Sequence, residues 1–258
     1  MNWDITLGGF VVGTLIGLTG MGGGLIMTPM LIFLFGVNPS VAVGTDLVYA
    51  SITKLVGAWQ HARQKTVDFA LVKILAWGSV PGALLGSFTV SLIQRHLSQA
   101  LMSAVMNRML GITYLIVTVI MLWRVLKKQK DQTKDLSERK LPSRWVLITL
   151  GFIIGTLVGL TSVGSGTLFI AVLVVIYPIA AAKLVGTDIV QALIVTGIAG
   201  LAHLAMHNVN LPMVASLLAG SIPGILLGSK FVLKIPDRAI RVSILCLLVL
   251  SSFKLLVR

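Results

Sequence analysis

The sequence contains one segment twice, and the two copies lie 142 residues apart. Aligned without a gap, residues 9–87 and 151–229 share 30 identities in 79 positions. The copies open with GFVVGTLIGLTGMGGG and GFIIGTLVGLTSVGSG. Such a duplication predicts two units of similar fold that pack against each other. We therefore expect a first transmembrane repeat at 1–126, a charged cytoplasmic linker at 127–144 and a second transmembrane repeat at 145–258.

Composition places both units in a membrane. The chain is 56% hydrophobic and only 11% charged, with a mean hydropathy of +0.98, whereas a soluble domain carries about 25% charged residues. Long uncharged apolar runs reach bilayer-spanning lengths, so we expect an all-α polytopic membrane protein. The net charge of +13 fits basic cytoplasmic loops such as the linker, and no nucleic-acid partner is expected.

Each repeat is expected to hold about five helical segments. The first two segments of each repeat are short: at about 1.5 Å per residue they reach about 18–25 Å, against a hydrocarbon core of about 30 Å. They therefore predict a re-entrant pair that meets at the glycine-rich break, with complete but distorted spans as the alternative. The expected segments are 5–19, 25–36, 41–60, 70–93 and 99–124, then 145–161, 167–180, 184–205, 212–233 and 238–257.

Loop charges favour an inverted topology for the second repeat. An odd number of crossings per repeat follows from either interpretation of the short pair. With the amino terminus outside, Arg63 and Lys65 lie inside, while the matching loop at 203–211 lies outside and has no Lys or Arg. We expect both termini outside. Three basic residues count against this scheme: Arg95, Lys254 and Arg258.

Two aspartates recur at the same repeat position within apolar sequence. Asp46 and Asp188 each end a VGTD motif, whereas the other six acidic residues lie at termini, in loops or at segment ends. A charge in hydrocarbon normally faces a cavity, is paired or is protonated; helix capping is the alternative. We interpret both as proton-coupling residues. His61 and His203 also recur and join this group, although a hydrogen-bonded segment end is the simpler interpretation.

The two glycine-rich breaks predict an anion site. Half-helices that begin near Leu25 and Thr167 would direct unpaired N–H groups and positive dipole ends at a small oxyanion. Lys54, whose repeat counterpart is Thr196, would attract an anion or extend to the interface. The candidate substrate-binding residues are Thr19, Gly20, Gly22, Gly23, Gly24, Thr45 and Lys54, with Thr161, Ser162, Gly164, Ser165, Gly166 and Thr187 in the second repeat.

Enzyme motifs are absent from the sequence. GMGGG lacks the Gly-Lys-Ser/Thr ending of a P-loop, and no GxSxG, HExxH or paired-cysteine motif occurs; Cys246 is the single cysteine. We expect no enzyme, no cofactor and no metal. An intramembrane aspartyl hydrolase is the alternative from another class, although GTD differs from the GxGD that such proteases resemble. Inverted repeats with discontinuous helices and a midplane site are typical of secondary transporters.

The ordered motifs resemble the sulfite exporter TauE/SafE family of membrane permeases. The resemblance rests on the doubled break, VGTDLVYASITKLVGAWQH, VGTDIVQALIVTGIAGLAH, and GSVPGALLGS with GSIPGILLGS. It implies a multi-pass protein of the inner membrane that moves sulfite, thiosulfate, sulfoacetate or related organosulfonates, often outward, by alternating access. Much of the family has Thr-Ser where this chain has Thr45-Asp46 and Thr187-Asp188, which suggests a proton-coupled subgroup.

The expected partners follow from this interpretation. They are a small anionic substrate and the lipid bilayer, and a homodimer is compatible with the sequence. A proton-coupled carrier of another small organic anion is the alternative transporter.

Overall fold

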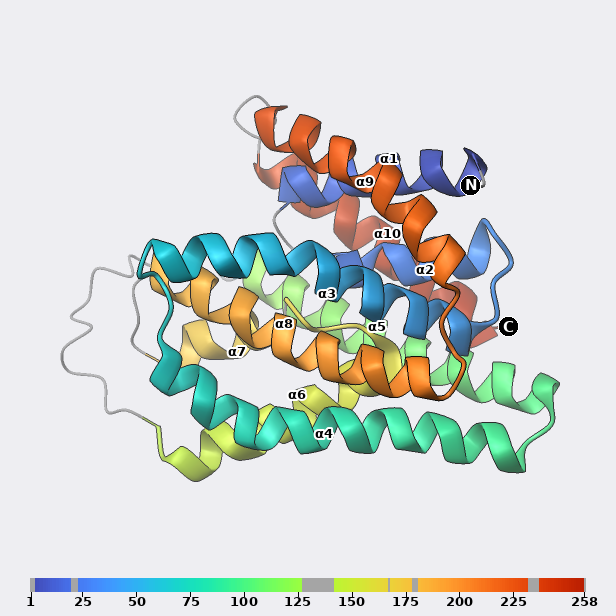
Figure 1. Cartoon of the computed structure of the whole chain (residues 1–258), viewed down its shortest axis with the longest axis horizontal. Coiled ribbons are helices and arrows are strands. Elements are labelled where there is room, and N and C mark those ends of the chain that lie inside the picture. The colour runs from blue at the N-terminus through green and yellow to red at the C-terminus, as the bar shows by residue number, and fades with distance from the viewer. Residues whose placement is uncertain are drawn as a thin grey trace.

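The computed structural model describes a bundle of helices (Figure 1), and no strand occurs in the residues that it describes, which are 3–19, 23–126, 142–166, 168–177, 181–231 and 237–257. The first repeat holds α1 (Trp3–Thr19), η1 (Gly23–Leu25), α2 (Met27–Phe33), α3 (Pro39–Arg63), α4 (Phe69–His96) and α5 (Gln99–Leu126). The second holds α6 (Arg144–Thr161), α7 (Leu168–Ile176), α8 (Ala181–Ala205), α9 (Leu211–Phe231) and α10 (Asp237–Val257). These bounds confirm the predicted segments and the all-α class.

Local sequence explains where the long helices begin. Asn38 precedes α3, and its side chain accepts a hydrogen bond from Ser40 N at 3.2 Å, with Pro39 at the first helical position. Asp68 precedes α4, and its Oδ1 accepts hydrogen bonds from Ala70 N at 3.1 Å and Leu71 N at 3.0 Å. Both caps satisfy amides that the helix itself leaves unpaired.

Six helices in the described chain are long and apolar enough to cross a membrane: Pro39–Arg63, Phe69–His96, Gln99–Leu122, Arg144–Thr161, Lys183–Ala205 and Leu211–Ser229. The protein is therefore a multi-pass membrane protein. One of these spans lies in α6, which the sequence placed among the short segments; its 18 residues reach about 27 Å. The second segments are short as predicted, since α2 has 7 residues and α7 has 9.

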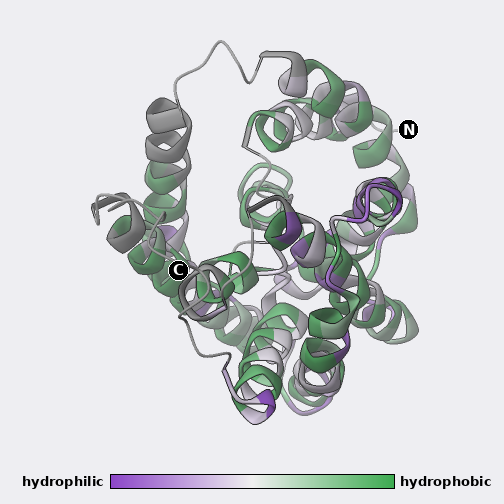
Figure 2. Cartoon of the chain, turned by 90° about the vertical axis from the view of Figure 1, so that its left-hand side faces the viewer, coloured by the Kyte–Doolittle hydropathy of each residue, from purple (hydrophilic) through white to green (hydrophobic). Residues whose placement is uncertain are grey.

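The outside of the bundle is apolar. Figure 2 shows hydrophobic residues along most of the helices, and large side chains such as Trp77 on α4 and Leu250 on α10 are 78% and 71% exposed. A soluble protein rarely exposes so much contiguous apolar surface. Lipid is the solvent that suits these faces.

The two repeats exchange helices. The first helix of each repeat packs along the fourth helix of the other, so that α1 lies on α9 and α6 lies on α4 (Figure 1). Glycines make this close packing feasible: a Cβ on Gly13 would clash with the backbone of Ser221, and a Cβ on Gly155 with that of Ser79. These pairs are related by the 142-residue offset. The glycines of the GSVPGALLGS and GSIPGILLGS motifs thus lie in helix contacts.

The third helices of the two repeats lie side by side and run antiparallel. Gly44, near the start of α3, packs against the backbone of Asn208, which follows α8. Gly186, near the start of α8, packs against Thr66, which follows α3. Exchanging the two repeats therefore leaves these contacts unchanged, as a two-fold relation requires.

Candidate functional site

The two glycine-rich breaks lie against each other. Gly24 of η1 is so close to the second break that a Cβ there would lie 2.7 Å from the backbone oxygen of Ser162. Ser162 ends α6 in the left-handed conformation, with φ of 63°, and Gly164 follows with φ of 100°. Left-handed residues stop a helix and turn the chain. The breaks thus bring the non-helical backbone of both repeats to one place.

Asp46 lies at this joint and is fully buried. Its Oδ2 accepts hydrogen bonds from Thr28 Oγ1 at 2.6 Å and from Ser162 Oγ at 3.0 Å. Thr28 belongs to α2 and Ser162 to the second break, so one carboxylate of α3 connects elements of both repeats. Its Oδ1 is buried without a hydrogen-bond partner among the described residues.

Asp188 occupies the equivalent place on α8 in different surroundings. It is 3% exposed, and its buried Oδ1 has no hydrogen-bond partner within the described chain. The repeat counterparts of the two hydroxyl donors to Asp46 are Ile170 and Gly20. Neither carries a hydroxyl group, so the second repeat lacks the side chains that could satisfy its aspartate in the same way.

Lys54 places one positive charge close to both aspartates. It is half-buried on α3, its Nζ donates to Ser165 Oγ at 3.5 Å, and its charge interacts with both Asp46 and Asp188. Its repeat counterpart is Thr196, whose hydroxyl donates to the backbone oxygen of Ala192 at 2.8 Å. The cation therefore breaks the two-fold relation at the site.

Three further polar residues were missed from the sequence. Thr28 has a repeat counterpart without a hydroxyl, so the repeat gave no signal for it. Tyr114 of α5 donates to the backbone oxygen of Gly24 at 3.4 Å. Gln191 donates to Ser79 Oγ at 2.6 Å and is fully buried. A buried glutamine three residues after Asp188 could have been found, because this spacing puts both on one helix face.

The two VGTD threonines bind backbone at opposite ends of the α3–α8 pair. Thr45 Oγ1 accepts from Asn210 N at 3.1 Å, and Thr187 Oγ1 accepts from Asp68 N at 2.9 Å. Asp68 and Asn210 are themselves repeat counterparts. Both hydroxyls, predicted for substrate, are thus directed at the hairpin that joins the third and fourth helices of the other repeat.

The two histidines lie at the same two ends but differ in burial. His203 is fully buried, and its Nε2 lies 2.9 Å from the backbone oxygen of Gly159. His61 is half-buried, and its Nδ1 lies 2.9 Å from Thr66 Oγ1. Both are hydrogen-bonded helix ends, and neither is recorded in contact with Asp46 or Asp188.

The remaining predicted site residues belong to the breaks. Gly23 lies against the ring of Tyr49, and Thr161 Oγ1 donates to the backbone oxygen of Leu157 at 2.6 Å. Gly166 is half-buried at the end of the second break. Gly20, Gly22 and the side chain of Thr19 lie outside the described residues.

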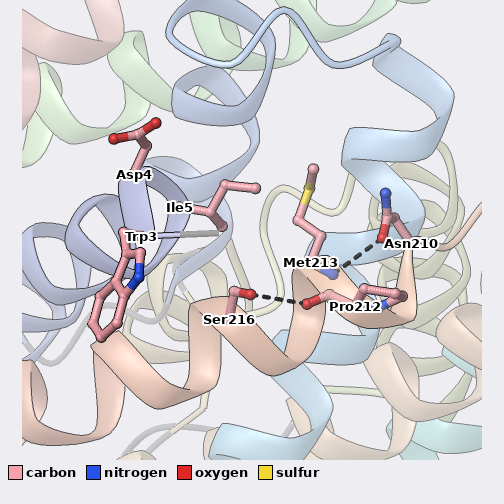
Figure 3. A pocket seen from close by; sticks show the side chains of 7 residues that line it. All are labelled: Trp3, Asp4, Ile5, Asn210, Pro212, Met213 and Ser216. Carbon is pink, nitrogen blue, oxygen red and sulfur yellow. Dashed lines mark hydrogen bonds between the residues drawn. The ribbon is translucent and has the colours of Figure 1, made fainter. Parts of the chain in front are cut away.

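A separate cavity of about 850 Å³ opens between the starts of α1 and α9 (Figure 3). There Asn210 Oδ1 accepts from Met213 N at 3.0 Å, and Ser216 donates to the backbone oxygen of Pro212 at 3.1 Å. None of its lining residues is a predicted site residue: Trp3, Asp4, Ile5, Asn210, Pro212, Met213 and Ser216. The buried polar groups around Asp46 and Lys54 therefore remain the candidate site.

A family model described as "Sulfite exporter TauE/SafE" matches residues 5–255, nearly the whole chain. The chain belongs to the sulfite exporter TauE/SafE family. Among similar proteins, probable membrane transporter protein YjnA of Bacillus subtilis is 39% identical over 99% of this chain and 100% of its own length. A probable membrane transporter protein of Methanocaldococcus jannaschii is 28% identical over 96% of this chain and 93% of its own length.

No solved structure matches the chain. The TauE/SafE family, the names of the relatives and the six apolar helices together make this protein a membrane transporter.

Proposed function

We propose that this protein is a secondary transporter that carries a small sulfur-containing anion, such as sulfite, thiosulfate or an organosulfonate, outward across the cytoplasmic membrane. The observation that supports the site best is Lys54, which reaches Ser165 at 3.5 Å beside the joint of the two breaks. An ammonium group with neighbouring hydroxyls is suited to the oxygens of a small anion. The family description supports the sulfur-containing substrate.

Alternating access around this site is supported by the relation of the two repeats. Equivalent helices run antiparallel and exchange equivalent contacts, so two states of opposite access can be built from one set of contacts. In the proposed topology 1–126 and 145–258 are inverted repeats, both termini lie outside and 127–144 lies in the cytoplasm. The substrate would reach Lys54 from one side at a time.

Proton coupling is supported by the charges at the site. A carboxylate beside an anion repels it through a medium of low dielectric, unless the carboxylate is protonated or paired. We assign coupling to the recurring titratable residues: Asp46, Asp188, His61 and His203. The TauE/SafE relatives supply the transporter class, and these residues supply the coupling hypothesis for this chain.

Counterflow in proteoliposomes tests the substrate. Vesicles loaded with unlabelled sulfite or thiosulfate should accumulate external ³⁵S-labelled anion, and Lys54→Met should lose this exchange because the ammonium group is gone. Lys73→Gln removes an exposed lysine of α4 and should exchange like the wild type. Stronger competition by carboxylates than by sulfur oxyanions would favour a carrier of another organic anion. No exchange of any of these anions by the wild type would overturn the proposal.

A further inference from the structure

The two VGTD aspartates are equivalent in sequence and differ in their surroundings. We infer that Asp188 is the carboxyl group that carries the proton during anion transport, whereas Asp46 is a positioning residue that holds the two breaks together. This inference rests on the proposed function and divides a task that the sequence assigned to both residues. It follows from hydrogen bonding, burial and charge at each carboxylate.

Asp46 accepts two hydrogen bonds that favour its ionised form. Thr28 and Ser162 both donate to the same oxygen, Oδ2, at 2.6 and 3.0 Å. Hydrogen bonds from two hydroxyls stabilise the ionised form, because a carboxylate accepts only. A proton cycling on and off Asp46 would weaken the link between α2 and the second break in each cycle. The residue therefore suits a permanent structural role.

Asp188 lacks such hydrogen bonds. Like Asp46 it is buried, at 3% exposed, and its Oδ1 has no hydrogen-bond partner among the described residues. Unlike Asp46, it accepts no hydroxyl hydrogen bond within the described chain, and the positions equivalent to the two donors carry no hydroxyl. A buried carboxylate without partners is costly when ionised and far less costly when protonated. A proton on Asp188 removes this cost without disrupting any hydrogen bond recorded for the residue. Its protonation state can therefore change while the packing of α8 is preserved.

The charged groups on the helices around α8 leave Lys54 as the main influence on Asp188. The charge of Lys54 on α3 acts on Asp188. The charged side chains of α4 and α6 are exposed, and the sequence of α7 contains none. Asp46, Tyr49 and His61 are the other titratable groups of α3 that are buried or half-buried. The exposed basic residues and histidine of α4 and α6 are Lys73, Arg95, His96 and Arg144.

The charge balance then couples the proton to the anion. With both aspartates ionised and Lys54 protonated, the site carries one net negative charge, and a bound monoanion would double it. A proton on Asp188 returns the net charge of the site to one negative charge when the anion is bound. We therefore expect one proton to bind Asp188 from the side where the anion binds Lys54. Both then leave on the other side, so anion and proton move in the same direction.

The test compares two assays on the same proteoliposomes. Counterflow needs no net proton movement, whereas accumulation driven by a pH gradient does. Asp188→Asn should retain measurable counterflow and lose at least tenfold in gradient-driven accumulation, together with its dependence on pH. Asp46→Asn should lower the thermal stability and slow both assays by a similar factor, so that their ratio stays close to the wild-type value. Asp4→Asn, an exposed control carboxyl, should leave both assays unchanged.

Three outcomes would overturn the inference while leaving the proposed transport of a sulfur-containing anion intact. Gradient-driven accumulation could persist in Asp188→Asn, it could be lost selectively in Asp46→Asn, or it could follow a sodium gradient and ignore a pH gradient. If Asp188→Asn does not fold, Asp188→Glu replaces it: accumulation should persist with a shifted pH profile, and an unshifted profile contradicts the assignment. Absence of counterflow in the wild type would instead contradict the proposed function itself.

Discussion

In the first repeat the buried aspartate accepts two hydroxyl hydrogen bonds, and in the second the equivalent aspartate has no such partner in the described chain. The packing contacts of the two repeats are, in contrast, nearly interchangeable. The glycines of α1 meet α9 as those of α6 meet α4. The helix packing is therefore the same in the two repeats, whereas the polar groups inside the bundle differ. Positions where the repeats differ are the ones to examine for transport chemistry.

The two ends of the α3–α8 pair show the same division. Both hairpins contain one left-handed residue at the equivalent position, Lys65 and His207. Yet His203 is fully buried at one end, whereas His61 is half-buried at the other. The backbone is thus repeated while the burial differs. A transporter that opens to one side at a time needs two ends of similar construction in different states.

The largest effect is expected where the repeats are alike. Gly155→Leu would force a side chain into the backbone of Ser79, and Gly13→Leu into that of Ser221. Overpacking against backbone costs about 3 kcal/mol or more, so both variants should yield little folded protein by size-exclusion chromatography in detergent. Gly197→Ala is the control, because a Cβ there meets nothing within 4 Å. Normal folding of only one leucine variant would contradict the equivalence of the two contacts.

A medium effect should separate the two aspartates. Asp46→Asn weakens two hydrogen bonds to a charged acceptor and should cost about 2 kcal/mol of stability. Asp188→Asn replaces a carboxyl group without recorded hydrogen bonds and should leave the unfolding midpoint unchanged or higher. Tryptophan fluorescence during thermal unfolding measures both. Equal losses in the two variants would show that the surroundings of the aspartates do not differ in energy.

The smallest effect concerns access to the two ends. In a Cys246→Ser background, Thr66→Cys should react with a water-soluble maleimide several times faster than Asn208→Cys. Thr66 is half-buried and its counterpart Asn208 is 1% exposed. Labelling followed by mass spectrometry gives both rates, with the cysteine-free protein as the blank. Similar rates at the two positions would mean that the ends do not differ in solution.

Much of the fold could be predicted from the sequence, because the repeat doubled every signal. Apolar runs and glycine-rich motifs located the helices to within a few residues. The exchange of helices between repeats could not be predicted. The pattern GxxxGxxxG at 9–17 shows that α1 packs closely on another helix, but it is the same whether the partner belongs to its own repeat or to the other one.

For the candidate site, the sequence predicted which residues lie together better than it predicted their contacts. The breaks, Asp46 and Lys54 do come together, since each carried a signal of its own: glycine where the helix must stop, or charge within apolar sequence. The hydroxyls of Thr45 and Thr187, which the sequence predicts to bind substrate, accept hydrogen bonds from backbone amides in this structure. Thr28 was missed. Hydroxyl groups are common in membrane helices, and only the tertiary arrangement decides which of them faces a buried carboxylate.

The packing of α1 and α6 on helices of the other repeat has a consequence for the synthesis and membrane insertion of the protein. When the ribosome has completed the first repeat, the glycine face of α1 still lacks the helix that will cover it, since α9 begins about 200 residues later at Leu211. Helix α1 must therefore remain in the bilayer without its packing partner until α9 has been synthesised. The same arrangement would arise from two separate copies of a single repeat, each lending its first helix to the other. An ancestor of half this length could thus have worked as a dimer of single repeats, and the linker then joined two subunits that already packed together.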